Sequence, residues 1–142
     1  RNGYAGRMQD LDREQARDIY RNEFFLRPRF NDVLELSQTI GEELFDTGVN
    51  CGVGTSGQFL QRSLNVLNQR AKLFPDLKVD GMIGDGTLRA LKAYLAARGA
   101  QGELVLMRML NALQGGYYVA ITEKREANED FIFGWFLNRV AL

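Results

Sequence analysis

The stretch GEELFDTGVNCGVGTSGQFLQRSLNVLN, residues 41–68, decides the fold. Its three glycines at positions 52, 54 and 57 meet the spacing G-x-G-x-x-G of a dinucleotide-binding turn. Such a turn requires that a buried and nearly all-apolar strand precedes the glycines. Here Glu42, Glu43 and Asp46 precede the glycines at helical intervals, so the segment before them is predicted to be a helix. We therefore expect the glycines to reverse the chain between two helices, and we expect no bound nucleotide.

Helical periodicity continues towards the N-terminus. A first helix is predicted to begin at a capping box formed by Asp12 and Gln15. It should end before Pro28, because the residue that precedes a proline is pushed out of the α region. Apolar residues within 33–45 then recur at helical spacing, which predicts a second amphipathic segment, bent near Gly41.

Helical signals also follow the glycines. Thr55 and Gln58 form another capping box, which predicts the start of a helix with an apolar face. A polar stretch at residues 69–78 separates this helix from the next. The pair at 80–81, Asp-Gly, predicts a tight turn, and residues 78–83 are the one place where a short extended piece is expected.

The C-terminal part of the chain is predicted to be helical as well. Asp85 is expected to cap a helix that closes at Gly99. An apolar stripe over residues 104–121 predicts a long helix that crosses the glycines at 115–116; the alternative is two helices split there. Asn128 is a candidate cap for the last helix, in which three side chains are expected to pack inward: Phe131, Trp135 and Leu137. The predicted fold class is mainly α.

Composition excludes several functional classes. The 142 residues include 18 Lys and Arg against 18 Asp and Glu, and this balance indicates neither nucleic acid nor an anionic membrane as partner. The chain has no histidine, which excludes Ser-His and Cys-His nucleophile pairs and His-ligated metals within it. Its single cysteine, Cys51, cannot form an internal disulfide. No apolar run approaches the roughly 20 residues of a spanning helix, so no membrane span is expected.

The segment DLKVDGMIGDGT, residues 76–87, partly matches a calcium-binding loop. With Gly81 at the sixth position, Lys78 falls at the third position and Thr87 at the twelfth. A cation beside the ion and the lack of a bidentate carboxylate argue against calcium. We therefore predict no metal and no cofactor.

Five motifs, taken in order, resemble a known family. They are YRNEFF (20–25), LFDTGVNCG (44–52), FLQRSLNVL (59–67), VDGMIGDGTLRAL (79–91) and FGWFLNRV (133–140). In this order they are similar to glycoside hydrolase family 108, the bacterial and prophage N-acetylmuramidases, endolysin-like enzymes that carry a C-terminal predicted peptidoglycan-binding region. The similarity extends over residues 3–140.

This resemblance implies a lysozyme-like helical fold, with peptidoglycan as the partner and no metal or cofactor. It implies that residues 1–70 are the C-terminal part of the catalytic region and that residues 71–142 form the helical peptidoglycan-binding region, both packed into one globule. The expected activity is hydrolysis of glycosidic bonds of the bacterial cell wall by a carboxylic general acid. The expected site of action is the wall, reached from the periplasm, the exterior or through a prophage lysis system.

The resemblance also implies a set of substrate-binding residues. Asp46 matches the Phe-Asp pair of the family, Asn50 and Gly52 match its Asn-x-Gly turn, and Tyr20 matches its tyrosine. At positions 24–25, however, two phenylalanines stand where Tyr-Trp is usual. That departure removes a hydroxyl and an indole donor from the expected sugar contacts.

Catalysis is the largest departure. The general acid of the family is the glutamate of an E-G-G motif, and no glutamate in this sequence is followed by two glycines. We expect the acid to lie upstream of Arg1 in a longer protein. The alternatives are a non-catalytic peptidoglycan-binding module and a helical protein that binds another partner.

The residues themselves suggest how the substrate would be held. Asp46 and Asn50 are four apart, so on a helix both can face one groove. Asn50 would then bind an N-acetyl group or a hydroxyl, and Asp46 would orient water or ligand; the alternative is that both satisfy backbone groups where the helix turns. Trp135 can stack on a sugar or pack in the core. Glu42 and Glu43 are predicted to lie on a solvated face.

Overall fold

The computed structural model describes residues 13–140. Its helices, in chain order, are α1 (Arg13–Arg21), the π-helix η2 (Asn22–Leu26), α2 (Phe30–Leu36), α3 (Gln38–Cys51), α4 (Val53–Leu67), α5 (Asp85–Lys124), the 3-10 helix η3 (Glu126–Asp130) and α6 (Ile132–Arg139). These described residues contain no strand. The mainly-α prediction is therefore confirmed, and the extended piece expected at residues 78–83 is irregular loop.

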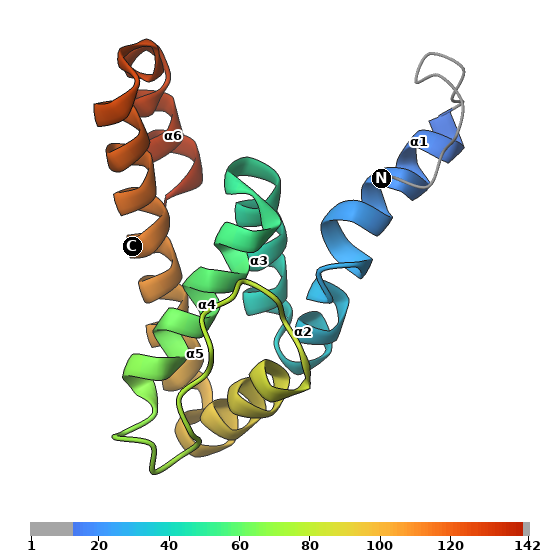
Figure 1. Ribbon diagram of the computed structural model, residues 1–142, viewed down its shortest axis with the longest axis vertical. Coiled ribbons are helices and arrows are strands. Elements are labelled where there is room, and N and C mark those ends of the chain that lie inside the picture. Colours follow the sequence, from blue (N-terminus) through green and yellow to red (C-terminus); the bar gives the residue numbers. More distant parts are fainter. Residues whose placement is uncertain (1–12, 141–142) are drawn as a thin grey trace.

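The α3–α4 pair stands at the centre of the molecule (Figure 1). The first part of α5 runs across the base of this pair, and the second part rises beside it with α6 folded back along it. On the other side, α1 extends away from the body. Within residues 13–140, no helix is both long enough and apolar enough to cross a membrane.

One hydrophobic core joins the helices. Its fully buried members include Phe30 from α2, Leu44 from α3, Leu60 from α4, and Leu91 and Leu106 from α5. Burial of each such side chain contributes about 1.5–3 kcal/mol, so the core is the main source of stability. Because its buried members run from Phe30 to Leu110 and come from α2, α3, α4 and α5, it holds the central helix pair and its neighbours together.

The second amphipathic segment is two helices rather than one. The chain breaks at Ser37, which is extended (φ −156°), and its Oγ accepts a hydrogen bond from the backbone N–H of Ile40 at 3.1 Å. The bend expected near Gly41 is therefore wrong, because a serine cap starts a new helix four residues earlier. Gly41 lies within α3, where a Cβ would be 2.6 Å from the α-carbon of Leu34.

Two predicted caps are also wrong. The helix after the glycines begins at Val53, so Thr55 and Gln58 lie inside it and do not cap it. Gly52, with φ 102°, reverses the chain between α3 and α4 as predicted. Asp85 begins α5, but its side chain makes no capping hydrogen bond, because it accepts one from Arg29 instead.

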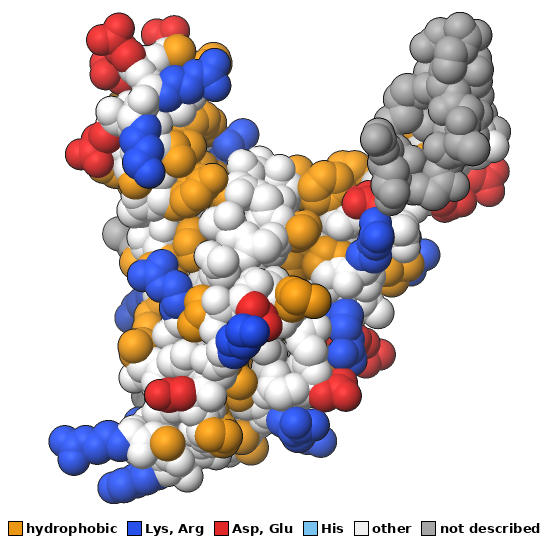
Figure 2. Space-filling model, viewed as in Figure 1, with side chains coloured by type: hydrophobic (Ala, Val, Ile, Leu, Met, Phe, Trp, Pro, Cys, Tyr) orange, Lys and Arg blue, Asp and Glu red, His pale blue; other side chains and the backbone are white. Residues whose placement is uncertain are grey.

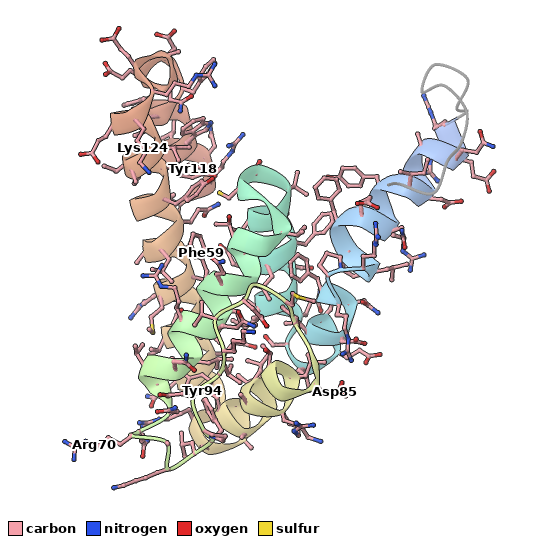
Figure 3. The ribbon with its side chains drawn as sticks, in the orientation of Figure 1. Phe59, Arg70, Asp85, Tyr94, Tyr118 and Lys124 are labelled. Atoms are coloured by element: carbon pink, nitrogen blue, oxygen red, sulfur yellow. The ribbon has the colours of Figure 1, made fainter. Side chains whose placement is uncertain are left out.

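The first helix ends before Pro28 as expected, since η2 stops at Leu26. The expected reason is wrong, because Arg27 keeps α-helical angles (φ −62°, ψ −45°) and the chain turns at Arg29 (φ 63°). Asp12 of the predicted capping box lies outside the described residues, as does the start of the family resemblance at Gly3. Helix α5 is interrupted at Gly99 (φ 63°, ψ −146°), where a helix end was predicted, but it resumes at once. The hydroxyl of Tyr94, labelled in Figure 3, spans the interruption by donating to the carbonyl of Gly102 at 2.7 Å.

The end of the chain differs in part from the prediction. Helix α5 continues through the glycines at 115–116 without a split. Trp135 stacks on Tyr118, with ring centroids 4.9 Å apart, so its packing is confirmed. Leu137, in contrast, is 71% exposed, so its expected inward packing is wrong. Phe131 is 56% exposed, although its ring stacks on Trp135 with centroids 6.1 Å apart. Asn128 does not cap the last helix; its amide donates to a carbonyl near the end of α5.

Candidate functional site

A cavity of about 470 Å³ opens between the N-terminal helices and α3. Helices α1, η2, α2 and α3 all contribute to its lining, which consists of Arg17, Tyr20, Arg21, Phe25, Leu34, Glu42, Phe45 and Asp46. Figure 2 shows apolar side chains gathered beside α3 on the side that faces α1, with acidic and basic side chains next to them. The cavity therefore combines an apolar floor with charged walls.

Aromatic rings form the floor. The ring of Phe45 on α3 meets Tyr20 edge to face, with centroids 6.1 Å apart, and it meets Phe25 in the same way at 5.7 Å. Tyr20 also lies 4.9 Å from Phe24. These contacts hold the ring of Tyr20 in place while 44% of the residue stays exposed. An anchored but exposed aromatic ring can stack on an apolar ligand surface.

The π-helix η2 places two of these rings. Its wider turn is closed by a hydrogen bond from the backbone N–H of Arg27 to the carbonyl of Asn22 at 2.9 Å. One extra residue in the turn shifts the side chains that follow, and such turns are frequent at functional sites. As a result Phe25 lies over Phe45 while Tyr20 remains on the preceding helix.

Two carboxylates form the wall opposite α1. Glu42 and Asp46 are one turn apart on α3 and both line the cavity. Burial raises the pKa of Asp46, and the negative charge of Glu42 raises it further. Glu42 accepts a hydrogen bond from Gln38 at 3.1 Å. The wall can thus accept hydrogen bonds from hydroxyl or amide groups of a ligand.

The structure brings together two of the four predicted substrate-binding residues. Tyr20 and Asp46 line the same cavity. Asn50 is exposed one turn further along α3, and Gly52 forms the reversal that follows; neither is among the lining residues. The substrate-binding role of all four residues stays a prediction.

Glu43 was assigned to a solvated face, and this is wrong. It is half-buried, whereas its neighbour Glu42 is exposed. Burial raises the pKa of Glu43 to about 7. The hydroxyl of Thr47 donates a hydrogen bond to the Glu43 carboxylate at 3.2 Å, and this opposes the increase in pKa. Helical spacing alone does not separate the two glutamates, because the packing of neighbouring helices against α3 decides which one is covered.

A second polar centre joins α4 to the loop before α5. The amide of Gln61, which is 1% exposed, accepts from the backbone N–H groups of Asp80 and Gly81 at 3.1 and 2.8 Å. It donates to the Asp80 carboxylate and the Met82 carbonyl, both at 3.0 Å. Two hydrogen bonds to the Asp80 carboxylate lower its pKa. The larger effect comes from the backbone N–H of Met82 and the smaller from the amide of Gln61. The Asp-Gly turn is therefore built around one buried side chain.

Among the described residues no group of three or more Cys, Asp or Glu side chains is placed to hold a metal ion.

Comparison with known families gives two matches. The Glycosyl hydrolase 108 family matches residues 1–52, and the Predicted Peptidoglycan domain family matches residues 56–140. No curated protein matches the chain. Both matches agree with the resemblance and indicate a peptidoglycan-related function.

Proposed function

The chain belongs to the Predicted Peptidoglycan domain family, and we propose that it binds glycan strands of peptidoglycan in the cavity between α1 and α3 as part of an N-acetylmuramidase. The observation that carries this proposal is the meeting of Tyr20 and Asp46 in one cavity. Sugar rings offer apolar faces to an aromatic ring and hydroxyl groups to a carboxylate. An apolar pocket with a few converging polar groups is the usual form of a ligand site.

The proposed chemistry is hydrolysis of a glycosidic bond. It requires a protonated carboxylic acid at the leaving oxygen and a second carboxylate, or a positioned water, on the other face of the sugar. In this proposal Asp46 takes the second role and orients the water or the substrate. Asn50 binds an N-acetyl group further along α3. The match to Glycosyl hydrolase 108 supports this assignment.

The general acid would be the glutamate of an E-G-G motif, the role that the family resemblance gives to that residue. Such a protein would act on the cell wall and would be delivered there from the cell or by a prophage lysis system. The second candidate is binding without cleavage. It is favoured by the match of residues 56–140 to the Predicted Peptidoglycan domain family.

Sedimentation with insoluble peptidoglycan tests the binding. Tyr20→Ala and Asp46→Asn should each lower the fraction of protein that sediments, because they remove the stacking surface and the acceptor charge. Asp130→Asn, an exposed change in η3, serves as the control. Equal sedimentation of all variants and wild type would remove the cavity from the proposal.

Release of reducing ends from purified peptidoglycan tests the cleavage. A protein that carries an E-G-G glutamate together with these 142 residues should release reducing ends, and its Glu→Gln variant should not. Equal release by both would contradict the assignment as a muramidase. Binding without any release would support the second candidate.

A further inference from the structure

The two walls of the cavity carry opposite charges, and no ion pair joins them in the described part of the chain. Arg17 and Arg21 are one turn apart on α1, and Tyr20 lies between them on the same side of the helix. Across the cavity, Glu42 and Asp46 are one turn apart on α3. Within residues 13–140, neither of the two arginines forms an ion pair. The cavity thus keeps a pair of guanidinium groups apart from a pair of carboxylates.

Arginines close by in the chain behave differently. Arg27 pairs with Glu23 one turn away on its own helical segment. Arg29 donates to Asp32 at 2.8 Å and to Asp85 at 3.1 Å. Acidic partners are therefore available to this part of the fold. The two cavity arginines instead line the cavity beside Tyr20, and no ion pair joins either of them to a carboxylate within the described residues.

Helix α1 itself is held lightly. None of its residues is buried, and its contacts are mainly with η2, the helical segment that directly continues it. In Figure 1 it extends from the body beside α3. Its arginines are consequently carried on a helix whose position owes little to core packing. Such a helix can adjust to a ligand at a small cost in packing.

We infer that Arg17 and Arg21 bind a carboxylate of the peptidoglycan repeat while Tyr20 stacks on the adjoining sugar ring. This inference rests on the proposed function. The carboxylate has two sources: the lactyl group of a muramyl sugar that carries no peptide, and the short peptide attached to that group. Neutral polymers of N-acetylglucosamine carry no carboxylate and lack this contact.

The charge pattern also fixes the direction of the ligand. Guanidinium groups bind carboxylates through paired, charge-assisted hydrogen bonds. The acidic wall of Glu42 and Asp46 repels a carboxylate and accepts hydrogen bonds from hydroxyl and amide groups. A muramyl unit therefore lies with its acidic substituent towards α1 and its hydroxyl groups towards α3.

Calorimetric titration with three soluble ligands tests the inference. The ligands are a disaccharide with a peptide-free muramic acid, the same disaccharide with its peptide, and the neutral N-acetylglucosamine dimer. Wild type should bind at least one acidic ligand about tenfold more tightly than the neutral one, as expected for a charge-assisted hydrogen bond. The acidic ligand that binds more tightly identifies the source of the carboxylate.

The variants isolate the arginines. Arg17→Ala and Arg21→Ala should each weaken the acidic ligand several-fold, and the double variant should bind acidic and neutral ligands alike. Alanine favours a helix at least as much as arginine, so α1 should stay folded. Arg108→Ala, an exposed change on α5, should leave all three affinities unchanged.

The possible results distinguish the role of the two arginines from the proposed function. Equal binding of acidic and neutral ligands by wild type, or acidic preference that survives the double variant, overturns the role of the arginines and leaves the proposed function standing. Failure of wild type to bind any of the three ligands overturns both.

Discussion

Gly57 and Gly81 pack backbone against backbone: a Cβ on Gly57 would overlap the carbonyl oxygen of Gly81 and lie 3.1 Å from its α-carbon. The third glycine of the G-x-G-x-x-G spacing thus makes room for the Asp-Gly turn. Gly81, with φ 77°, also lies close to Gly54, since its own Cβ would be 2.6 Å from the Gly54 carbonyl oxygen. Helix α4 and the turn are consequently in direct backbone contact.

Gly57→Ala should lower the free energy of unfolding by about 2–3 kcal/mol, because an added methyl group in this contact forces the backbones apart. Urea denaturation followed by circular dichroism measures the change. Gly54→Ala, on the same helix, is the matched control, since its Cβ would meet no atom within 4 Å. Similar unfolding free energies for the two variants would contradict the close contact.

Gln61→Leu should lower the free energy of unfolding by about 2–4 kcal/mol, because it leaves several buried donors and acceptors of the Asp-Gly turn without partners. Gln58→Leu changes an exposed glutamine one turn earlier and should have little effect. The same denaturation experiment compares them. If Gln61→Leu were as stable as Gln58→Leu, the turn would not depend on this side chain.

Glu43 should make stability depend on pH. Its pKa is raised in the folded protein, from 4.5 to about 7, so the folded state holds the proton more tightly than the unfolded state. The associated stabilisation is complete below the unfolded pKa and is lost as the pH rises through about 7. With allowance for partial exposure of the carboxyl, we expect a loss of about 1–2 kcal/mol.

Glu43→Gln tests this expectation, because the variant cannot ionise. Its unfolding free energy relative to wild type should increase by about 1–2 kcal/mol between roughly pH 4 and pH 9. Glu42→Gln, the exposed neighbour, should show a nearly constant difference. A constant difference for Glu43→Gln as well would show that Glu43 is solvated.

Tyr20→Phe should retain most of the affinity for soluble peptidoglycan fragments, whereas Tyr20→Ala should lose about five- to tenfold, because stacking depends on the ring and is worth about 1 kcal/mol or more. Fluorescence or calorimetric titration measures both. Phe133→Ala removes another exposed ring, 79% accessible on α6, and should have no effect. Equal losses for Phe133→Ala and Tyr20→Ala would argue against a defined site at Tyr20.

Local signals in the sequence predict much of the fold. Pro28 and Gly99 mark helix interruptions at the expected places. At Gly99 the glycine itself adopts the non-helical angles, whereas near Pro28 the left-handed residue is Arg29. The break at Ser37 is harder to predict, since the apolar periodicity continues in phase across it. Helix α4 starts earlier than its capping box suggests, because Gly52 ends one helix and the next begins at the following residue.

Fewer of the site residues can be predicted from the sequence. Tyr20 and Asp46 follow from the family resemblance, and they share a cavity. Arg17 and Arg21 join them only because α1 lies opposite α3, a relation between segments more than 20 residues apart. The spacing of these two arginines around Tyr20 is the signal that could have found them. The burial of Glu43 likewise depends on how helices pack and not on its neighbours in sequence.

The reversal at Gly52 falls where the Glycosyl hydrolase 108 match ends, four residues before the Predicted Peptidoglycan domain match begins. The two matched segments are therefore joined by helices packed side by side, with no tether between them. In the proposed function, residues 56–140 therefore act as a packed support behind α3 and its two carboxylates, so that a glycan held against α3 meets the C-terminal half of the chain in one orientation.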